Sequence, residues 1–426
     1  MERLIFHIDV NSAFLSWEAA RRVALGEPDL RLVPSAIGGD PKTRTGIILA
    51  KSIPAKAYGV RTGEPIGMAL RKCPQLQLAK PDFALYEECS HNFLEICRKY
   101  TPVVEQFSID ECFLDMSGMQ RIYPDPIAAA HRIKDEIRDT LGFTVNVGVG
   151  SNKLLAKMAS DFEKPDRVHT LFSNEIQEKM WGLPVRELFT VGKNTAERLE
   201  SARITTIGAL AAAEPAVLRA IVGEKTATQL HQFANGIDNS PVQAEAEEAK
   251  GYSNSTTVAQ DIITDTEAYR ILLALSDSVT SRMRMDGKQA YCVCVTIRGQ
   301  DFRDQSHQKK LREPTDVTSE VYETAKQLFR ELWDHRTPLR LLGVSLTQLT
   351  QDGGGQLSLF PDEQREHERK LDRLIDSIRE RFGADTVVRG SVIGCNRRIA
   401  AKEKAKAENE RKKKAENTKE QDKKGR

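Results

Sequence analysis

The chain contains 426 residues, 40% of them apolar, and this length suggests three or four domains, each with its own core. It has no run of about 18 apolar residues, which excludes a membrane span, and the charged segment from Met1 to Asp9 is not expected to be a signal peptide. The seven cysteines are scattered without a Cys-x-x-Cys pair, so we expect neither a disulfide framework nor a zinc site, and we expect a reducing cytoplasm.

The net charge of +2 hides two unequal parts of the chain. Residues 401–426 hold 11 Lys and Arg against 6 Asp and Glu, so the other 400 residues carry a net charge of −3. The folded body is therefore not a globally basic nucleic-acid binder, and any such function must depend on local patches.

The first 170 residues alternate strand and helix patterns. Strands are predicted over the segments with a strand-like apolar pattern, at 4–9, 46–50, 107–116 and 143–149. Helices are predicted where apolar residues recur at helical spacing, after Ser12 and over 127–141 and 152–162. This interleaving predicts an α/β sheet with helices on one face.

Residues 180–240 are short, helical and rich in Ala and Glu, with a faint internal repeat. The pattern Val-Gly-x-x-Thr-Ala-x-x-Leu occurs at 191–199 and again at 222–230. A glycine turn that opens a helix resembles a helix–hairpin–helix unit, whose backbone amides can bind a phosphate. Two helical hairpins with ordinary turns explain the repeat equally well, and both interpretations stay open.

A linker is predicted at 238–252, followed by a separate α+β domain. Its helices are expected near 265–285 and 316–334, and its strands near 290–298, 304–312 and 339–349. Residues 282–312 hold eight basic and three acidic residues, which indicates either a nucleic-acid patch or a solvated strand face. After the spacer Gly353–Gly355, a helix near 364–382, a strand near 385–393 and a disordered or frayed tail are expected.

Three carboxylates, those of Asp9, Asp110 and Glu111, lie in apolar strand-like segments, where a charge needs a partner or a metal. Carboxylate and carbonyl oxygens suit Mg²⁺, and two such ions can support an in-line phosphoryl displacement. Neighbouring strand residues point to opposite faces, so Asp110 and Glu111 can share a site only if a turn or bulge intervenes. Buried ion pairs with Lys or Arg are the alternative.

Four ordered motifs resemble those of the Y-family translesion DNA polymerases. They are His7–Phe14, the fingers segment Ile53–Val60, Ser108–Asp115, and the last palm motif Gly148–Lys157 with Glu163–Pro165. Their order and spacing extend the resemblance over about residues 1–350. The resemblance implies a multidomain α+β fold shaped like a right hand, with a palm, small fingers, a helical thumb and a C-terminal α+β little finger.

The resemblance also implies domain boundaries. We expect the palm at 1–12 and 82–171, the fingers at 13–81, the thumb at 172–240, a linker at 241–252, the little finger at 253–350, a second linker at 351–363, a helix and strand at 364–400, and a disordered basic tail at 401–426.

Site residues follow from the same motifs. Asp9, Asp110 and Glu111 are expected to be catalytic and to ligate two Mg²⁺ ions, with help from the backbone carbonyl of Val10. Phe14 falls at the steric gate that excludes a ribose 2′-hydroxyl, although an ordinary core residue of the helix would fit the pattern as well.

Nucleotide binding is expected from Lys56 and Lys164, which fall where the family contacts the triphosphate. Lys56 stands where most members carry an arginine, and Ile53 stands where members often carry a tyrosine. Lys56 thus offers a point charge in place of a bidentate guanidinium, and Ile53 offers no donor in place of a hydroxyl. This predicts weaker nucleotide binding, or compensation from Arg44 or Lys51. A further difference is Thr190, where Gly-Val-Gly is usual.

A separate motif follows the glycine spacer. The segment Gln356–Phe360 resembles the bacterial pentapeptide that binds the sliding clamp. Leu357, Leu359 and Phe360 can fill an apolar pocket while Gln356 orients the peptide, although a short segment packed on its own domain is the alternative.

Three functions are weighed. The first is a template-directed, low-fidelity translesion DNA polymerase without proofreading, a cytoplasmic monomer that binds primer–template DNA, dNTPs and the sliding clamp and no membrane. The second is another palm enzyme such as a nucleotidyl cyclase, which would need neither residues 180–350 nor a clamp peptide. The third is an accessory factor that binds primer ends and the clamp, favoured only by Ile53 and Lys56.

Overall fold

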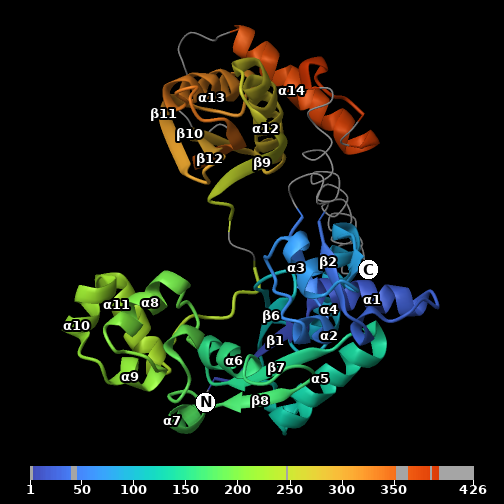
Figure 1. Cartoon of the computed structure of the whole chain (residues 1–426), viewed down its shortest axis with the longest axis vertical. Coiled ribbons are helices and arrows are strands. Elements are labelled where there is room, and N and C mark those ends of the chain that lie inside the picture. Colours follow the sequence, from blue (N-terminus) through green and yellow to red (C-terminus); the bar gives the residue numbers. More distant parts are fainter. Residues whose placement is uncertain (1–2, 40–45, 246–247, 352–362, 384–385, 393–426) are drawn as a thin grey trace. The chain divides into compact units, whose positions relative to one another are not determined.

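A computed structural model describes residues 3–39, 46–245, 248–351, 363–383 and 386–392 (Figure 1). The described residues divide into two compact units: the first comprises 3–39 and 47–245, and the second comprises the described residues from 248 onward together with Gly46. Among the described residues, no helix combines the length and the apolar character that a membrane crossing requires.

The first unit is built on a five-stranded sheet with the order β5-β6-β1-β7-β8. Strand β1 (Ile5–Val10) pairs antiparallel with β6 (Glu111–Asp115) and β7 (Val145–Gly150), while β5 (Val104–Gln106) and β8 (Val168–Leu171) form the edges. Successive strand residues face opposite sides, so Phe6 and Ile8 enter the larger core while His7 and Asp9 lie on the other face.

Helices cover both faces of this sheet, so the prediction of helices on one face is wrong. Helices α4 (Phe83–Arg98) and α5 (Pro126–Leu141) pack on the Phe6 side. Helix α6 (Lys153–Ser160) packs on the His7 side, where Gly148 pairs with His7. A Cβ at Gly148 would lie 2.0 Å from the Ala156 carbonyl oxygen, so only glycine permits this close approach.

The predicted strand over 107–116 begins only at Glu111. Residues 107–110 form a turn instead, in which the backbone amides of Phe107 and Ser108 both donate to the Glu111 carbonyl oxygen, at 3.0 and 3.1 Å. Asp110 therefore precedes the strand and is freed from its alternation of faces.

A smaller sheet in the first unit has the order β3-β2-β4. Its strands are β2 (Ser35–Gly38), β3 (Ile48–Lys51) and β4 (Gln77–Ala79). They pack with α1 (Ala13–Ala24), α2 (Ile53–Ala57) and α3 (Ile66–Lys72) around two small apolar clusters.

Short helices follow between residues 176 and 234. They are α7 (Ile176–Lys179), α8 (Lys193–Ser201), α9 (Ile207–Ala212), α10 (Pro215–Val222) and α11 (Glu224–Ala234), and their core includes Leu154 and Leu155 of α6. The two repeat glycines directly precede helices, Gly192 before α8 and Gly223 before α11. Thr190 adopts a left-handed φ of 76°, a conformation that suits the glycine usual at this position.

The second unit contains an antiparallel sheet with the order β11-β10-β12-β9. Strands β10 (Lys288–Gly299), β11 (Asp304–Thr315) and β12 (Leu339–Gln351) and helices α12 (Asp265–Met285) and α13 (Thr318–Leu332) were predicted, with shorter strands. Strand β9 (Gly251–Ile262) was missed, because its polar sequence shows little apolar alternation.

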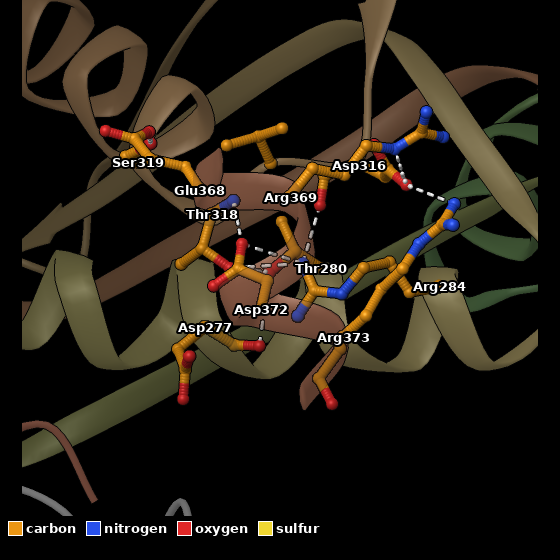
Figure 2. Close-up of polar contacts among 12 residues, drawn as sticks. Asp277, Thr280, Arg284, Asp316, Thr318, Ser319, Glu368, Arg369, Asp372 and Arg373 are labelled. Atoms are coloured by element: carbon orange, nitrogen blue, oxygen red, sulfur yellow. Dashed lines mark hydrogen bonds and ion pairs between the residues drawn. The ribbon is translucent and has the colours of Figure 1, made fainter. Parts of the chain in front are cut away.

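Helix α14 (Glu363–Phe382) docks on α12 and α13 through charged side chains (Figure 2). The buried Asp372 carboxylate accepts hydrogen bonds from Arg389 at 2.6 Å, from the Thr318 amide at 2.8 Å and from Arg284 at 3.3 Å. Asp376 pairs with Arg284 at 2.7 Å. The predicted strand over 385–393 is wrong in its described part, where Gly390–Val392 is a 3₁₀ helix.

Candidate active site

The backbone places the three predicted carboxylates near the end of β1. Asp9 lies directly opposite Glu111 in the antiparallel register of β1 and β6, so both side chains project on the α6 face. The backbone amide of Val10 donates to the Asp110 carbonyl oxygen at 3.0 Å, which fixes the preceding turn beside the same strand end. Because Asp110 lies in this turn, the alternation of strand faces does not set the direction of its side chain relative to Glu111.

Two lysines pair with these carboxylates. Lys164 forms an ion pair with Asp9, and Lys157 of α6 donates to Glu111 at 2.6 Å. Burial raises the pKa of Asp9 to about 6, although Lys164 acts in the opposite direction. Burial lowers the pKa of Lys157, but the hydrogen bond to Glu111 and the charge of Asp161 more than offset this, so that its pKa is raised.

The loop that carries Lys164 is fixed by two asparagines. The Asn146 side-chain amide donates to the carbonyl oxygens of Ser160 and Glu163, at 3.1 and 2.6 Å. The Asn11 side-chain oxygen accepts from the Asp166 amide at 2.9 Å. Lys164 is therefore held at the end of β1 by hydrogen bonds on both sides of it in the chain.

The donor set of this site fits a hard divalent cation. Asp9, Asp110, Glu111 and the Val10 carbonyl offer only oxygen atoms, which Mg²⁺ prefers. Among the described residues, no three carboxylate, histidine or cysteine groups converge on one point, consistent with the ion pairs that Asp9 and Glu111 make with lysines.

An open cavity of about 450 Å³ lies beside the carboxylates. Asp9, Val10 and Asp110 line one part of it, together with the predicted gate Phe14 and with Lys164. Residues of β3 and α2 and of the loop after them also line it, among them Lys51, Ile53, Lys56 and Thr62. Glu111 does not line the cavity, but it lies opposite Asp9 in the strand register. The predicted clamp-binding residues Gln356–Phe360 lie outside the described residues.

Phe14 is held rigidly by other rings. Its ring stacks on Tyr86 with centroids 4.5 Å apart and planes 10° apart, and Phe83 meets both rings edge-on. Phe14 therefore lines the cavity with a ring that is packed against other aromatic side chains.

Sequence reasoning missed two contributors, Lys157 and Tyr86. A signal for Lys157 was present, because it is the one charged residue in the apolar segment Leu154–Ser160 of α6. Tyr86 carried no such signal, since its contact with Phe14 joins elements about 70 residues apart.

Comparison with known proteins identifies the class. The impB/mucB/samB family matches residues 8–161, the C-terminal domain of that family matches 249–359, and the thumb domain of DNA polymerase iota matches 186–238. A solved Y-family DNA polymerase chimera shares the fold, with a TM-score of 0.71 and 24% identity over 81% of this chain and 98% of that one.

Two bacterial relatives match almost end to end. The DNA polymerase IV of Clostridium acetobutylicum is 42% identical over 395 residues, which cover 92% of this chain and 99% of the relative. The DNA polymerase IV of Acetivibrio thermocellus is 38% identical over 405 residues, which cover 93% and 100%. The chain therefore belongs to the impB/mucB/samB family, the Y-family DNA polymerases, as the motifs indicated. It is a DNA-directed DNA polymerase of the translesion class.

Proposed function

We propose that the chain extends a primer by template-directed, two-metal nucleotidyl transfer at the end of β1. The observation that supports this most directly is the placement of Asp9, Asp110 and Glu111 at one strand end beside a cavity that is also lined by lysines. Two Mg²⁺ ions, held by these carboxylates and the Val10 carbonyl, would activate the primer hydroxyl and stabilise charge on the phosphates.

Lysines around the cavity would bind the triphosphate and position Glu111. Lys56 and Lys164 bind the triphosphate, and Lys164 exchanges its pairing with Asp9 for the phosphate charge. Lys157 keeps Glu111 in place from the rigid helix α6. Binding and alignment of the α-phosphate near the primer end supply much of the rate enhancement.

Phe14 is proposed as the steric gate. Because Tyr86 fixes its ring, Phe14 cannot move aside for a ribose 2′-hydroxyl, and deoxynucleotides are selected. The Phe14→Ala protein should add ribonucleotides much more readily than the wild type, while its use of dNTPs changes less.

DNA contacts are proposed for the second unit and for the helices between 176 and 234. Strand β11 exposes Lys309, Lys310 and Arg312 within the basic stretch 282–312. Phosphate contacts of this kind release counterions, so DNA binding should weaken steeply with salt. The proposed polymerase has no proofreading exonuclease activity.

The sliding clamp is proposed as a partner through Gln356–Phe360, which binds as a short peptide while the enzyme acts as a monomer. Tethering of this kind raises the effective concentration of the active site at a primer end. A cytoplasmic location is supported by the free thiols of all six described cysteines, including Cys97 and Cys112, whose sulfur atoms lie only 3.8 Å apart.

An accessory factor that binds primer ends is the alternative, favoured by Ile53, which lines the cavity without a hydrogen-bonding group. It predicts DNA and clamp binding without nucleotide addition, and no effect of Phe14→Ala on nucleotide choice.

The decisive experiment is extension of a labelled primer–template with Mg²⁺ and each dNTP separately. Template-matched addition by the wild type, lost in Asp110→Ala but retained in the surface control Asp139→Ala, is expected. DNA binding by Asp110→Ala should be unchanged. Synthesis by Asp110→Ala at the wild-type rate would overturn the proposed site, and no addition by any protein would favour the accessory factor.

A further inference from the structure

The fingers side of the cavity brings two lysines together. Lys51 is the last residue of β3, and Lys56 lies in α2, five residues later in the sequence. Both line the cavity that Asp9 and Asp110 face from the other side. Ile53 stands between them in sequence; 64% of the residue is exposed, and its side chain has no hydrogen-bond donor.

Lys51 is held in position by a neutral group. Its ammonium donates to the Thr62 hydroxyl at 3.2 Å, and Thr62 lines the same cavity. Within the described part of the chain, no ion pair joins Lys51 to a carboxylate. The nearby Glu64 carboxylate is already engaged by Lys72 at 2.5 Å and by the Arg61 amide at 2.7 Å.

This arrangement is unfavourable for the free protein. Burial and then the charge of Lys56 lower the pKa of Lys51, and the charge of Glu64 offsets this only in part. Two cations that line one cavity, with no ion pair to a carboxylate among the described residues, are stabilised when a multiply charged anion enters it. The triphosphate of a nucleotide has this charge and length.

We infer that Lys51 is a third triphosphate-binding residue, positioned by Thr62, and that Lys51 and Lys56 act as two separate point charges in place of one arginine fork. This inference rests on the proposed function of the cavity as the nucleotide site. It assigns to Lys51 the role left open by Ile53, because an ammonium held by Thr62 supplies the directed donor that Ile53 lacks.

The test compares single substitutions in single-nucleotide primer extension, with KM for the dNTP and kcat measured separately. Lys51→Met should raise KM about tenfold, the loss expected for one charge-assisted hydrogen bond, while kcat changes less than about threefold. Thr62→Val should raise KM about twofold to threefold, because Lys51 remains but is no longer oriented. Lys51→Arg should stay near the wild type. Lys80→Met, which removes an exposed lysine that does not line the cavity, is the matched control.

A binding measurement separates ligand contact from catalysis. Inorganic tripolyphosphate with Mg²⁺ is titrated calorimetrically into the enzyme bound to dideoxy-terminated primer–template, and its affinity should fall about tenfold in Lys51→Met and not in Lys80→Met. Thermal melting establishes that each variant folds.

The outcomes are distinguishable. If Lys56→Met raises KM and Lys51→Met does not, the inference about Lys51 is overturned while the proposed nucleotide site stands. If neither substitution changes KM or tripolyphosphate binding in a folded, active enzyme, the proposed placement of the triphosphate fails together with the inference.

Discussion

Two clusters of buried charge in the described part of the chain are matched in different ways. In the second unit, Asp372 is surrounded by the guanidinium groups of Arg284 and Arg389 and by a backbone amide. At the end of β1, Asp9 and Glu111 are paired instead with the ammonium groups of Lys164 and Lys157.

The choice of cation distinguishes structural from functional charge. Guanidinium groups donate in a fixed planar geometry, and together with an amide they satisfy the Asp372 carboxylate from several directions. An ammonium on a flexible stem is more easily exchanged for another cation, and Asp9 with its partner Lys164 lines an open cavity. The first cluster is closed by fixed hydrogen bonds. Under the proposed function, the second would exchange its lysine partners for metal and nucleotide.

The largest expected effect comes from removing charge at β6 without changing shape. Glu111→Gln keeps an acceptor for Lys157 but removes the charge of the proposed metal ligand, so nucleotide addition should fall at least about 10³-fold. Rapid-quench primer extension measures the rate, and urea unfolding should shift by less than about 1 kcal/mol. A variant that polymerises normally would show that Glu111 has only the structural role of an ion-pair partner.

In the second unit, removing a buried carboxylate is expected to lower stability. Asp372→Ala leaves Arg284 buried with one carboxylate fewer, so unfolding of this unit should cost about 3–5 kcal/mol less. Urea denaturation measures the change, and Glu366→Ala, an exposed partner of Arg369 at 3.9 Å, should change stability by less than about 0.5 kcal/mol. Equal effects of the two substitutions would contradict a structural role for the buried cluster.

At Asp9, removing the charge is expected to raise the free energy of unfolding, by less than Asp372→Ala lowers it. Its folded-state pKa of about 6 exceeds the ordinary 3.8, so between these values the folded chain binds a proton that the unfolded chain releases. The free energy of unfolding therefore falls as the pH rises through this window, and the buried charge is a cost above it. Asp9→Asn should stabilise the chain by about 1–2 kcal/mol at pH 8 in chelator, and this gain should vanish near pH 4.

Chemical denaturation at the two pH values measures this difference, with Asp139→Asn as the exposed control. A gain at pH 8 that persists unchanged at pH 4 would show that the ionised Asp9 is not its source.

The candidate site was predictable from the sequence where short motifs carry it, as for Asp9, Phe14 and Lys164, all of which line the cavity. The position of Asp110 before the strand was not, because it depends on a turn at 107–110 that moves the start of β6 to Glu111, four residues after the predicted start. The apolar pattern of a segment does not locate the first residue of a strand to within a few residues.

Parts of the fold escaped prediction for related reasons. Strand β9 is polar and shows little alternation, so no pattern marked it. In α14 the pattern would even favour the wrong orientation, since Leu374 and Phe382 are exposed while Asp372 and Asp376 are buried. Only the arginines of other elements explain that choice, and their positions are tertiary information.

The glycines of β7 have a further consequence. Backbone atoms of α6 occupy the space where a side chain at Gly148 or Gly150 would be, and α6 carries Lys157 to Glu111. Even one added methyl group at Gly148 must lift the helix and change the spacing of the catalytic face. A mutational scan should therefore find these two positions as intolerant as the carboxylates, although neither glycine carries a reactive group.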